Sequence, residues 1–449
     1  MRILAITAGA GGMYCGSCLR DNALATEMIT RGHDVSLLPI YTPTLTDEAN
    51  VSGGQVLFGG ISVYLQQHVP LMRRTPAILD KIWDSAPVIR AFASRSSAVD
   101  PKFLGELTVS TLRGEDGFQA KEVGKLVEWL KQQRRFDAIV LPNSMLIALA
   151  APIRRAVGGP ILCTLQGEDL FLEGLDEPYK SQSLELIRQK VAEVDGFIAV
   201  SRYYGEFMGK YLGIPPDKID VVPLGITLEG HADARPPRDG PFTIGYFARV
   251  APEKSLDILV EAYRILRQEK SLPPSRLEAA GYMADEHKPY LVRIEARLEE
   301  CGLRGEFRYH GTVDRAAKIR FLQDLDVLSV PSRYVEPKGL YLLEAMANGV
   351  PVVQPRHGAF PEMIEATGGG LLFEPGNPEA LADALLSLWR DQNLRREMGH
   401  RGALGVARHY GASQMAERAL EVYRRRAAVG GPDRTIREAG QVDFMNSPD

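Results

Sequence analysis

The stretch "VLSVPSRYVEPKGLYLLEAMANGVPVVQP", from Val327 to Pro355, holds a strand, a loop, a helix and a second strand in succession. Short apolar runs stand at both of its ends, as buried parallel strands do. Pro337 and Gly339 mark the loop, and "LYLLEAMANG" predicts a helix that Gly349 closes. Because a helix joining two strands is the unit of a parallel sheet, this stretch predicts a doubly wound α/β domain.

The same alternation of apolar runs and helical patterns extends over most of the chain in two sets. The runs of the first set begin at Arg2, Asp34, Asp137, Pro160, Gly196 and Ile219. Those of the second set begin at Phe242, Arg276, Glu306, Val327, Val350 and Gly370. We therefore expect the α/β class, with two Rossmann-like doubly wound domains that face each other across a cleft. Open parallel sheets bind ligands at the carboxyl ends of their strands, so both domains would present loops to that cleft.

Charge and proline content place the boundary between the two sets. Residues 229–241, "EGHADARPPRDGP", are charged and rich in proline and glycine, as linkers are. This predicts a first domain over 1–228, a second over 242–410, a helix over 411–430 that returns to the first domain, and a polar tail over 431–449. Ser255 is expected to cap the first helix of the second domain.

Residues from about 50 to 120 do not follow the alternation, since they are apolar, aromatic and locally basic. The interpretation we favour is a helical insertion packed on the first sheet. The alternative is a surface that holds an acceptor or rests on anionic lipid as a peripheral membrane contact. The basic side chains that suggest this alternative are Arg73, Arg74, Lys81, Arg90 and Arg95.

Bulk composition is that of an ordinary soluble protein. Of the 449 residues 45% are hydrophobic and 24% charged, and a net charge of −4 gives no sign of a nucleic-acid partner. No run reaches the roughly 18 apolar residues that a membrane span needs, and the N-terminus is too short and glycine-broken for a signal peptide. Four cysteines are too few for a disulfide scaffold, which favours a cytoplasmic setting. We also expect the protein to be able to lie at the inner face of the membrane as a peripheral protein.

Four charged side chains lie where such a fold would present them to the cleft. Glu336 precedes the helix of the opening stretch, and Glu344 lies inside it. Arg249 and Lys254 lie in "ARVAPEKS", between a strand and a helix, and an Arg fork beside a Lys charge suits a diphosphate. Solvated surface charges are the alternative for each pair.

Several separate motifs occur in the order of a known family. "PSRYVEPKGLYLLEAMANGVPVV" is similar to its segment with two glutamates eight residues apart, and "ARVAPEKS" to its loop with Arg and Lys. "VDGFIAVSRYYGEFMGKYLGIPPDKIDVVPLGI" looks like the end of its first domain. The chain thus resembles the retaining glycosyltransferases of the glycogen synthase, sucrose synthase and bacterial mannosyltransferase group, glycosyltransferase family 4-like enzymes with the GT-B fold.

The resemblance implies an activity and its participants. A sugar would pass from a nucleotide-diphosphate donor, held by the second domain, to a hydroxyl of a carbohydrate or lipid acceptor on the side of the first. Transfer would retain the anomeric configuration, by front-side attack, without a metal or a further cofactor. A phosphorylase or disaccharide synthase of the same fold is an alternative, as is a catalytically silent protein that binds sugar nucleotides.

The resemblance also assigns roles to individual residues. Glu336 would hydrogen-bond the donor sugar, and Glu344 would bind the ribose hydroxyls. Arg249 and Lys254 would hold the diphosphate and stabilise the leaving group, where negative charge develops. The backbone N–H groups of Gly339 and Leu340 would face the same anion from a helix N-terminus.

Two departures from the family pattern fall on candidate functional residues. "TLQGED" has Gln166 where the family has a histidine, and glutamine cannot carry a proton near neutral pH. The silent-protein alternative rests on this difference. Lys338 replaces a phenylalanine, and is expected either to meet an acidic or phosphorylated group or to be solvated. We place both residues on the acceptor or sugar side. "DLD", Asp324 to Asp326, imitates a metal-binding motif, but it begins an apolar strand and is interpreted as structural.

The segment "GAGGMYCGSC", Gly9 to Cys18, follows the first strand. Gly9, Gly11 and Gly12 would let donor and acceptor approach the backbone. Cys15 and Cys18 would open the following helix. Small packing thiols are the favoured interpretation of this pair, and a regulatory dithiol or a metal site are the alternatives.

Overall fold

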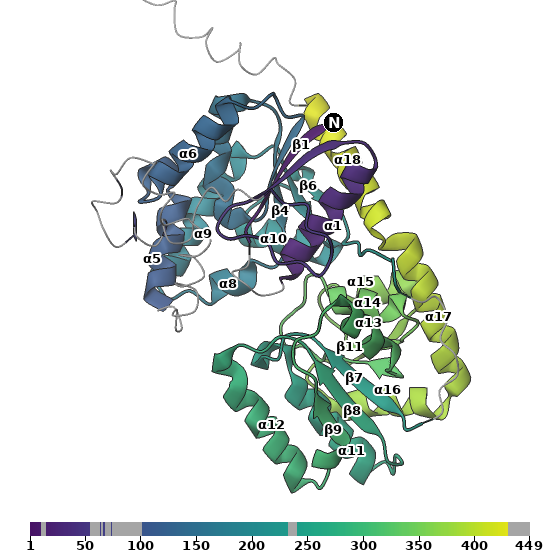
Figure 1. The fold of residues 1–449 in the computed structure, drawn as a ribbon. Helices are drawn as coiled ribbons and strands as arrows, with labels where there is room; N and C mark the ends of the chain where they lie inside the picture. The colour runs from purple at the N-terminus through teal and green to yellow at the C-terminus, as the bar shows by residue number, and fades with distance from the viewer. Residues whose placement is uncertain are drawn as a thin grey trace, which may run out of the picture.

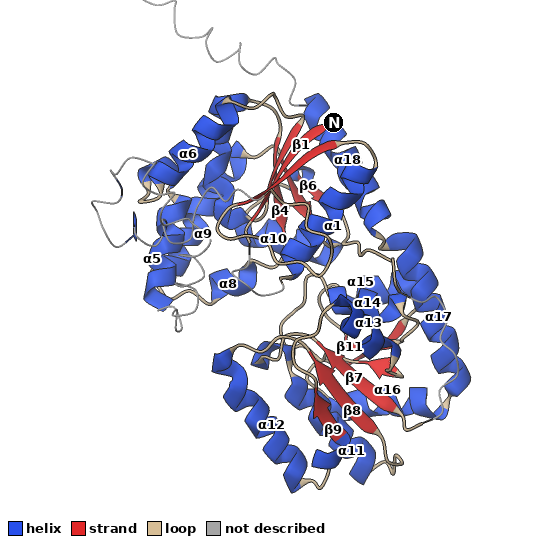
Figure 2. Cartoon of the chain, in the orientation of Figure 1, coloured by secondary structure: helices blue, strands red, loops and turns tan. Residues whose placement is uncertain are grey.

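The computed structural model describes residues 1–9, 15–53, 63, 66, 67, 73, 101–231 and 240–429. The first sheet has six parallel strands in the order β2-β1-β3-β4-β5-β6, and Figures 1 and 2 show it in the upper half of the molecule. Its strands are β1 (Arg2–Thr7), β2 (Asp34–Pro39), β3 (Ala138–Leu141), β4 (Ile161–Leu165), β5 (Gly196–Ala199) and β6 (Ile219–Val221).

The second sheet also has six parallel strands, in the order β12-β11-β10-β7-β8-β9. Its strands are β7 (Thr243–Phe247), β8 (Arg276–Ala280), β9 (Phe307–Tyr309), β10 (Val327–Leu328), β11 (Val352–Pro355) and β12 (Gly370–Phe373). All twelve strands fall on the apolar runs of the sequence, so the predicted α/β class with two doubly wound sheets is confirmed. The strand order reverses between β1 and β3 and between β7 and β10, which are the places where such sheets bind ligands.

Helices cover both sheets (Figure 2). Around the first lie α1 (Gly16–Thr30), α5 (Pro101–Leu112), α6 (Ala120–Lys131), α7 (Ala150–Val157), α8 (Asp169–Glu173), α9 (Tyr179–Lys190) and α10 (Arg202–Leu212). Around the second lie α11 (Leu256–Gln268), α12 (Lys288–Glu300), α13 (Arg315–Gln323), α14 (Leu340–Ala347), α15 (Phe360–Thr367), α16 (Pro378–Arg390) and α17 (Gln392–His409). No helix among these described ranges is long and apolar enough to cross a bilayer.

The last helix, α18 (Ala412–Val429), lies on the first sheet, although it follows the second in sequence (Figure 1). Met415, Ala419 and Tyr423 are buried in one cluster with residues of β1 and α1. Two chain segments therefore pass between the domains. They lie side by side, since Ile226 exchanges backbone hydrogen bonds of 2.9 Å with Tyr410 and Ala412.

The sequence set residues 50–120 apart, and the structure describes few of them before α5. Arg73 donates hydrogen bonds to the carbonyls of Gln66 and Gln67, and its guanidinium lies 3.5 Å from the ring centroid of Phe118. This arginine is therefore held within the first domain by described residues, and the choice between a packed insertion and an acceptor or lipid surface stays a prediction. The other four basic residues that suggested a lipid surface, Arg74, Lys81, Arg90 and Arg95, lie outside the described residues.

Two local expectations need correction. Ser255 precedes α11 in a left-handed conformation, φ 58°, and its hydroxyl makes no capping bond to the helix. Instead, Ser255 Oγ accepts from the backbone N–H of Arg333. Gly9 is required by a contact inside the domain, because a Cβ there would lie 2.0 Å from the carbonyl oxygen of Thr42. Gly11 and Gly12 lie outside the described residues, so their ligand role stays a prediction.

Candidate active site

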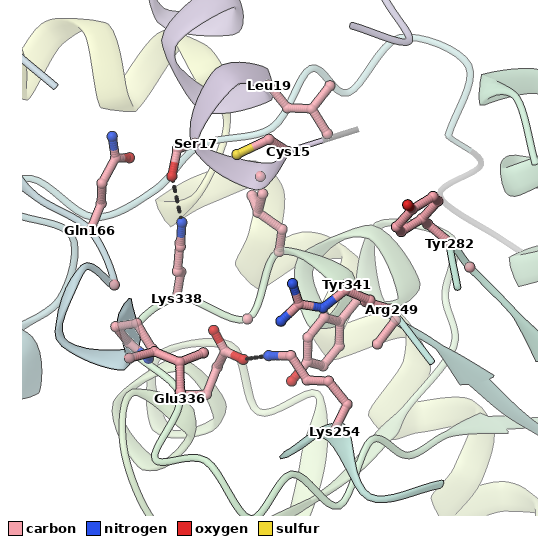
Figure 3. A pocket seen from close by; sticks show the side chains of 18 of the residues that line it. Cys15, Ser17, Leu19, Gln166, Arg249, Lys254, Tyr282, Glu336, Lys338 and Tyr341 are labelled. Carbon is pink, nitrogen blue, oxygen red and sulfur yellow. Dashed lines mark hydrogen bonds and ion pairs between the residues drawn. The ribbon is translucent and has the colours of Figure 1, made fainter. Parts of the chain in front are cut away.

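A cavity of about 500 Å³ opens between the two domains. Its lining comes from loops that follow strands at both reversal points, and it includes Cys15 and Asn143 from the first domain and Arg249 and Glu336 from the second. Figure 3 shows these walls facing each other. The cavity gathers eight of the residues that the sequence singled out for donor and acceptor, but not Gly9: Arg249, Lys254, Glu336, Glu344, Gly339, Leu340, Gln166 and Lys338.

Glu336 and Lys254 form a buried ion pair on the floor of the cavity, drawn as a dashed line in Figure 3. Burial alone would raise the pKa of the Glu336 carboxyl. The charge and hydrogen bond of Lys254, with contributions from Lys338 and the Gly339 amide, lower that pKa below its ordinary value. Glu336 is therefore ionised at neutral pH. The Glu336 backbone packs directly against Gly358. A Cβ at that position would lie 2.4 Å from the Glu336 carbonyl oxygen, so the contact requires glycine.

Arg249 comes from the same loop as Lys254, between β7 and α11. It forms an ion pair of 2.5 Å with Glu253, and its side chain is 39% exposed. The two cations of the loop are therefore both matched by carboxylates, one on the cavity floor and one at the rim.

Two helix N-termini point into the cavity. Gly339 adopts φ 68° immediately before α14, and the helix starts at Leu340, as the sequence predicted. The first turn of α1 lies opposite, close enough that a Cβ on Gly16 would lie 3.2 Å from Leu340. Since helix N-termini carry partial positive charge, both favour an anion between them.

Glu344 takes part in a buried triad that the sequence did not predict. Lys318 of α13 is 5% exposed, and its Nζ lies 2.6 Å from Glu344 Oε1 and also bonds to Asp47 of the first domain. Burial would lower the pKa of Lys318, but the two carboxylates together raise it. No local pattern joins Asp47 to Lys318, because they are 271 positions apart.

Gln166 lies on the opposite wall. Its Nε2 donates to the carbonyl of Pro142 at 2.9 Å, while its buried Oε1 has no protein partner among the described residues. The neighbouring Glu168 is buried, and burial raises the pKa of its carboxyl. Hydrogen bonds from the backbone N–H of Gln166 and from Ser144 oppose this rise without cancelling it. This wall thus holds one buried acceptor atom that no described residue uses.

Lys338 crosses the cleft and donates to Ser17 Oγ of α1 at 2.8 Å (Figure 3). Cys15, at the start of that helix, is half-buried in the cavity wall, whereas Cys18 is 1% exposed. Cys18 is therefore packed in the core and Cys15 lines the cavity, which leaves both packing thiols and a regulatory dithiol as interpretations of the pair. No group of three or more potential metal-ligating side chains occurs in the part of the chain that the structure describes.

The "DLD" segment lies away from this cavity. Asp326 accepts from the backbone N–H of Thr243 at 2.9 Å and lies 3.5 Å from Arg395. These bonds tie the start of β10 to its neighbours, which is a structural role.

Comparison of the sequence with known proteins agrees with this site. Residues 108–229 match the family "Glycosyltransferase Family 4", and residues 231–404 match "Glycosyl transferases group 1". The D-inositol 3-phosphate glycosyltransferase of Xylanimonas cellulosilytica is 31% identical over 251 residues, which are 52% of this chain and 58% of that protein. The phosphatidyl-myo-inositol mannosyltransferase of Mycobacterium leprae is 28% identical over 304 residues, 66% of this chain and 75% of that one.

Solved structures show the same fold. The sucrose-phosphate synthase of Thermosynechococcus elongatus has a TM-score of 0.69 at 18% identity, with 96% of this chain and all of the other covered. HepE of Anabaena, solved in complex with UDP, has a TM-score of 0.65 at 17% identity, with 95% and 100% covered. Because the two family matches follow each other along the chain and each covers one side of the cleft, the chain belongs to the group 1 and family 4 glycosyltransferases of the GT-B fold, which transfer a sugar from a nucleotide-diphosphate sugar.

Proposed function

We propose that this chain transfers a sugar, with retention of configuration, from a nucleoside-diphosphate sugar to a hydroxyl of a carbohydrate or lipid acceptor. One observation carries the proposal. Arg249, Lys254 and the N-terminus of α14 converge on a cavity that is also lined by the buried Glu336 and by Glu344, whose side chain is 12% exposed. Cations and a helix N-terminus together suit a diphosphate, and the glutamates suit hydroxyl groups.

On the donor side, Arg249 and Lys254 bind the diphosphate and stabilise the charge that grows on it as the glycosidic bond breaks. Glu336 accepts hydrogen bonds from the donor sugar, and Glu344 accepts them from the ribose. The backbone amides of Gly339 and Leu340 lie at the start of α14 and face the same anion. The UDP complex of HepE supports a nucleoside diphosphate in this fold.

On the acceptor side, Gln166 and Lys338 line the opposite part of the cavity. The free Oε1 of Gln166 accepts from a sugar hydroxyl, which needs no proton transfer by this residue. Lys338 suits an anionic group, and the relatives named above include enzymes of D-inositol 3-phosphate and of phosphatidyl-myo-inositol. We propose that the enzyme works in the cytoplasm, and at the inner membrane face where the acceptor is a lipid.

Measurement of nucleotide release from UDP-, GDP- and ADP-sugars tests this function. Slow release without an acceptor, and faster release with one, is the expected result for a transferase. A phosphorylase would instead consume inorganic phosphate and yield a sugar phosphate. Tight binding of a sugar nucleotide with no release under any condition would identify a silent binding protein and contradict the proposal.

A further inference from the structure

Two thiols in the first turn of α1 have opposite environments. Cys15 is half-buried and lines the cavity, three residues before Cys18, which lies in the core with the Thr7 hydroxyl 3.9 Å from its sulfur. The Cys18 thiol is a hydrogen-bond partner of the Cys15 sulfur. One sulfur is therefore open to small molecules that enter the cavity, and the other lies directly behind it.

Charges around the pair separate the two sulfurs further. The hydrogen bond from Cys18, the charge of Lys338 and the backbone amides of the helix start lower the pKa of Cys15 to about 5, against the opposing effect of burial. Lys338 reaches this turn from the other domain, where it donates to Ser17 (Figure 3). The pKa of Cys18 is raised, chiefly because its thiol is engaged with Cys15 and also because it is buried. At neutral pH the pair is thus a thiolate in the cavity and a protonated thiol behind it.

We propose that Cys15 is a site of reversible oxidative modification inside the donor cavity, with Cys18 as the resolving thiol and a hydroperoxide as the oxidant. The Cys15 thiolate attacks the terminal peroxide oxygen and the O–O bond breaks, so that Cys15 becomes a sulfenic acid. The leaving alkoxide or hydroxide takes a proton from solvent and departs as alcohol or water. Cys18 sulfur then attacks Cys15 sulfur, the S–O bond breaks, and water leaves with the thiol proton. Two thiols and one hydroperoxide give one disulfide, one alcohol or water, and one water.

The disulfide changes the wall of the donor cavity. Cys18 leaves its packed position beside Thr7, and the first turn of α1 has to shift with it. That turn carries Gly16, which lies against Leu340, and Ser17, which accepts from Lys338. Oxidation therefore disturbs the meeting point of the two helix N-termini and weakens donor binding, a consequence that rests on the proposed function.

Thiol labelling tests the modification without any assay of activity. In the full-length reduced protein at pH 7, we expect iodoacetamide to alkylate Cys15 about tenfold faster than Cys301, by peptide mass spectrometry, because the thiolate is the reactive form. Cys301 is the internal control, since it is half-buried and lies outside the cavity. Cys18→Ala should slow the labelling of Cys15, whereas Cys18→Ser, which keeps a hydroxyl donor at this position, should slow it less. Equal rates for Cys15 and Cys301 in the wild type would overturn the proposal.

Oxidation with hydrogen peroxide tests the second step. We expect a Cys15–Cys18 disulfide in the wild type and in Cys301→Ser, reversed by dithiothreitol, and none in Cys18→Ala. Calorimetry with UDP, GDP and ADP should show weaker nucleotide binding in the oxidised wild type and recovery on reduction. Peroxide treatment that leaves no disulfide overturns the resolving role of Cys18. A disulfide with unchanged nucleotide binding overturns the effect on the cavity. If the reduced protein binds no nucleotide while the disulfide still forms, the proposed function fails and the modification stands.

Discussion

At the scale of single residues, the cavity cations already have partners before a donor enters. Lys254 neutralises Glu336, and Arg249 neutralises Glu253. The two pairs differ in burial, because both members of the first are nearly inaccessible whereas Arg249 is more than a third exposed. Loss of Lys254 would leave a buried carboxylate unpaired, which typically costs about 3–5 kcal/mol. Arg249 therefore gives the cleaner test of diphosphate binding.

Arg249→Ala should lower the turnover number by about 100-fold, the scale for one preorganised contact to developing charge. The free energy of unfolding should change little, because the Arg249 pair is accessible to water and such pairs contribute at most about 1 kcal/mol. Steady-state kinetics and chemical denaturation measure the two quantities. Lys288→Ala is the matched control, since Lys288 is an exposed cation of the same domain that pairs with Asp285. Wild-type kinetics in Arg249→Ala would remove this residue from the mechanism.

The two glutamates should separate binding from turnover. Glu344→Gln is expected to weaken nucleotide binding by about 1–3 kcal/mol, as loss of a charged hydrogen bond does. Glu336→Gln should lower turnover more than nucleotide affinity, because it faces the sugar. Calorimetry with the free nucleotide and kinetics with its sugar distinguish the two. An equal loss of affinity in both variants would refute the division of roles.

Lys318 should act through Glu344, which makes it a positioning residue. Lys318→Met leaves Glu344 and Asp47 without their shared cation, so we expect weaker nucleotide binding. Calorimetric titration of the variant with UDP, GDP and ADP measures this loss of affinity. Arg315→Met is the control, because Arg315 also joins the two domains, through Glu48, without touching Glu344. An equal loss of nucleotide affinity in both variants would show that Lys318 only holds the domains together.

The sequence could name the glutamates and cations of the donor side because they lie in short local motifs. It could not name Asp47, Lys318 or Ser17. Asp47 and Ser17 meet their partners only across the two domains, and Lys318 meets Glu344 only once α13 and α14 have packed. Nor could it separate Cys15 from Cys18. Their spacing is that of one helical turn, and only the packing of α1 decides which of the two faces the cavity.

At the scale of elements, apolar runs bounded by turn residues were sufficient to locate all twelve strands. The opening stretch shows why. β10 and β11 are buried on both faces, α14 ends at Ala347, and Gly349 takes φ 69° just after it. The cap at Ser255 was wrong for a physical reason. A serine caps from an extended conformation, whereas this one is left-handed and serves the loop at Arg333.

The loop that carries Glu336 depends on the glycine of "GAFPE". Gly358→Ala should lower turnover, because its Cβ would lie 2.4 Å from the Glu336 carbonyl oxygen and force that loop to move. Gly376→Ala is a matched control. Gly376 has a similar positive φ, 75° against 60°, but open space around its Cβ position, so it shares the backbone strain and lacks the clash. Kinetics and melting temperature of both variants give the comparison. Similar turnover in the two would show that the position of Glu336 does not depend on this contact.

At the scale of the whole molecule, side chains from the two domains meet directly around the cavity. Tyr334 donates to Asp169 at 2.9 Å, and Glu362 accepts from the backbone of Arg202 and Tyr203. Together with the hydrogen bond from Lys338 to Ser17, these contacts fix the distance between the two domains at the cavity. Such closure excludes water and aligns the reactants.

Weakening these contacts should open the cleft without unfolding the domains. For the double variant Tyr334→Phe and Glu362→Gln, we expect a larger radius of gyration by small-angle scattering and a lower turnover number, with little change in melting temperature. Tyr290→Phe is the control, because its hydroxyl also donates to a carboxylate, Asp257, but within the second domain. An unchanged radius together with unchanged turnover would mean that these bonds do not set the separation of the domains.

The central claim is that the cavity between the domains binds a nucleoside diphosphate through Arg249 and its neighbours. Calorimetric titration of the wild type and of Arg249→Ala with UDP, GDP and ADP tests it most directly. The account predicts that at least one of the three binds the wild type at one site per chain, and that Arg249→Ala binds the same nucleotide about tenfold or more weakly. Absence of binding for all three nucleotides, or equal affinity in the folded variant, would contradict it.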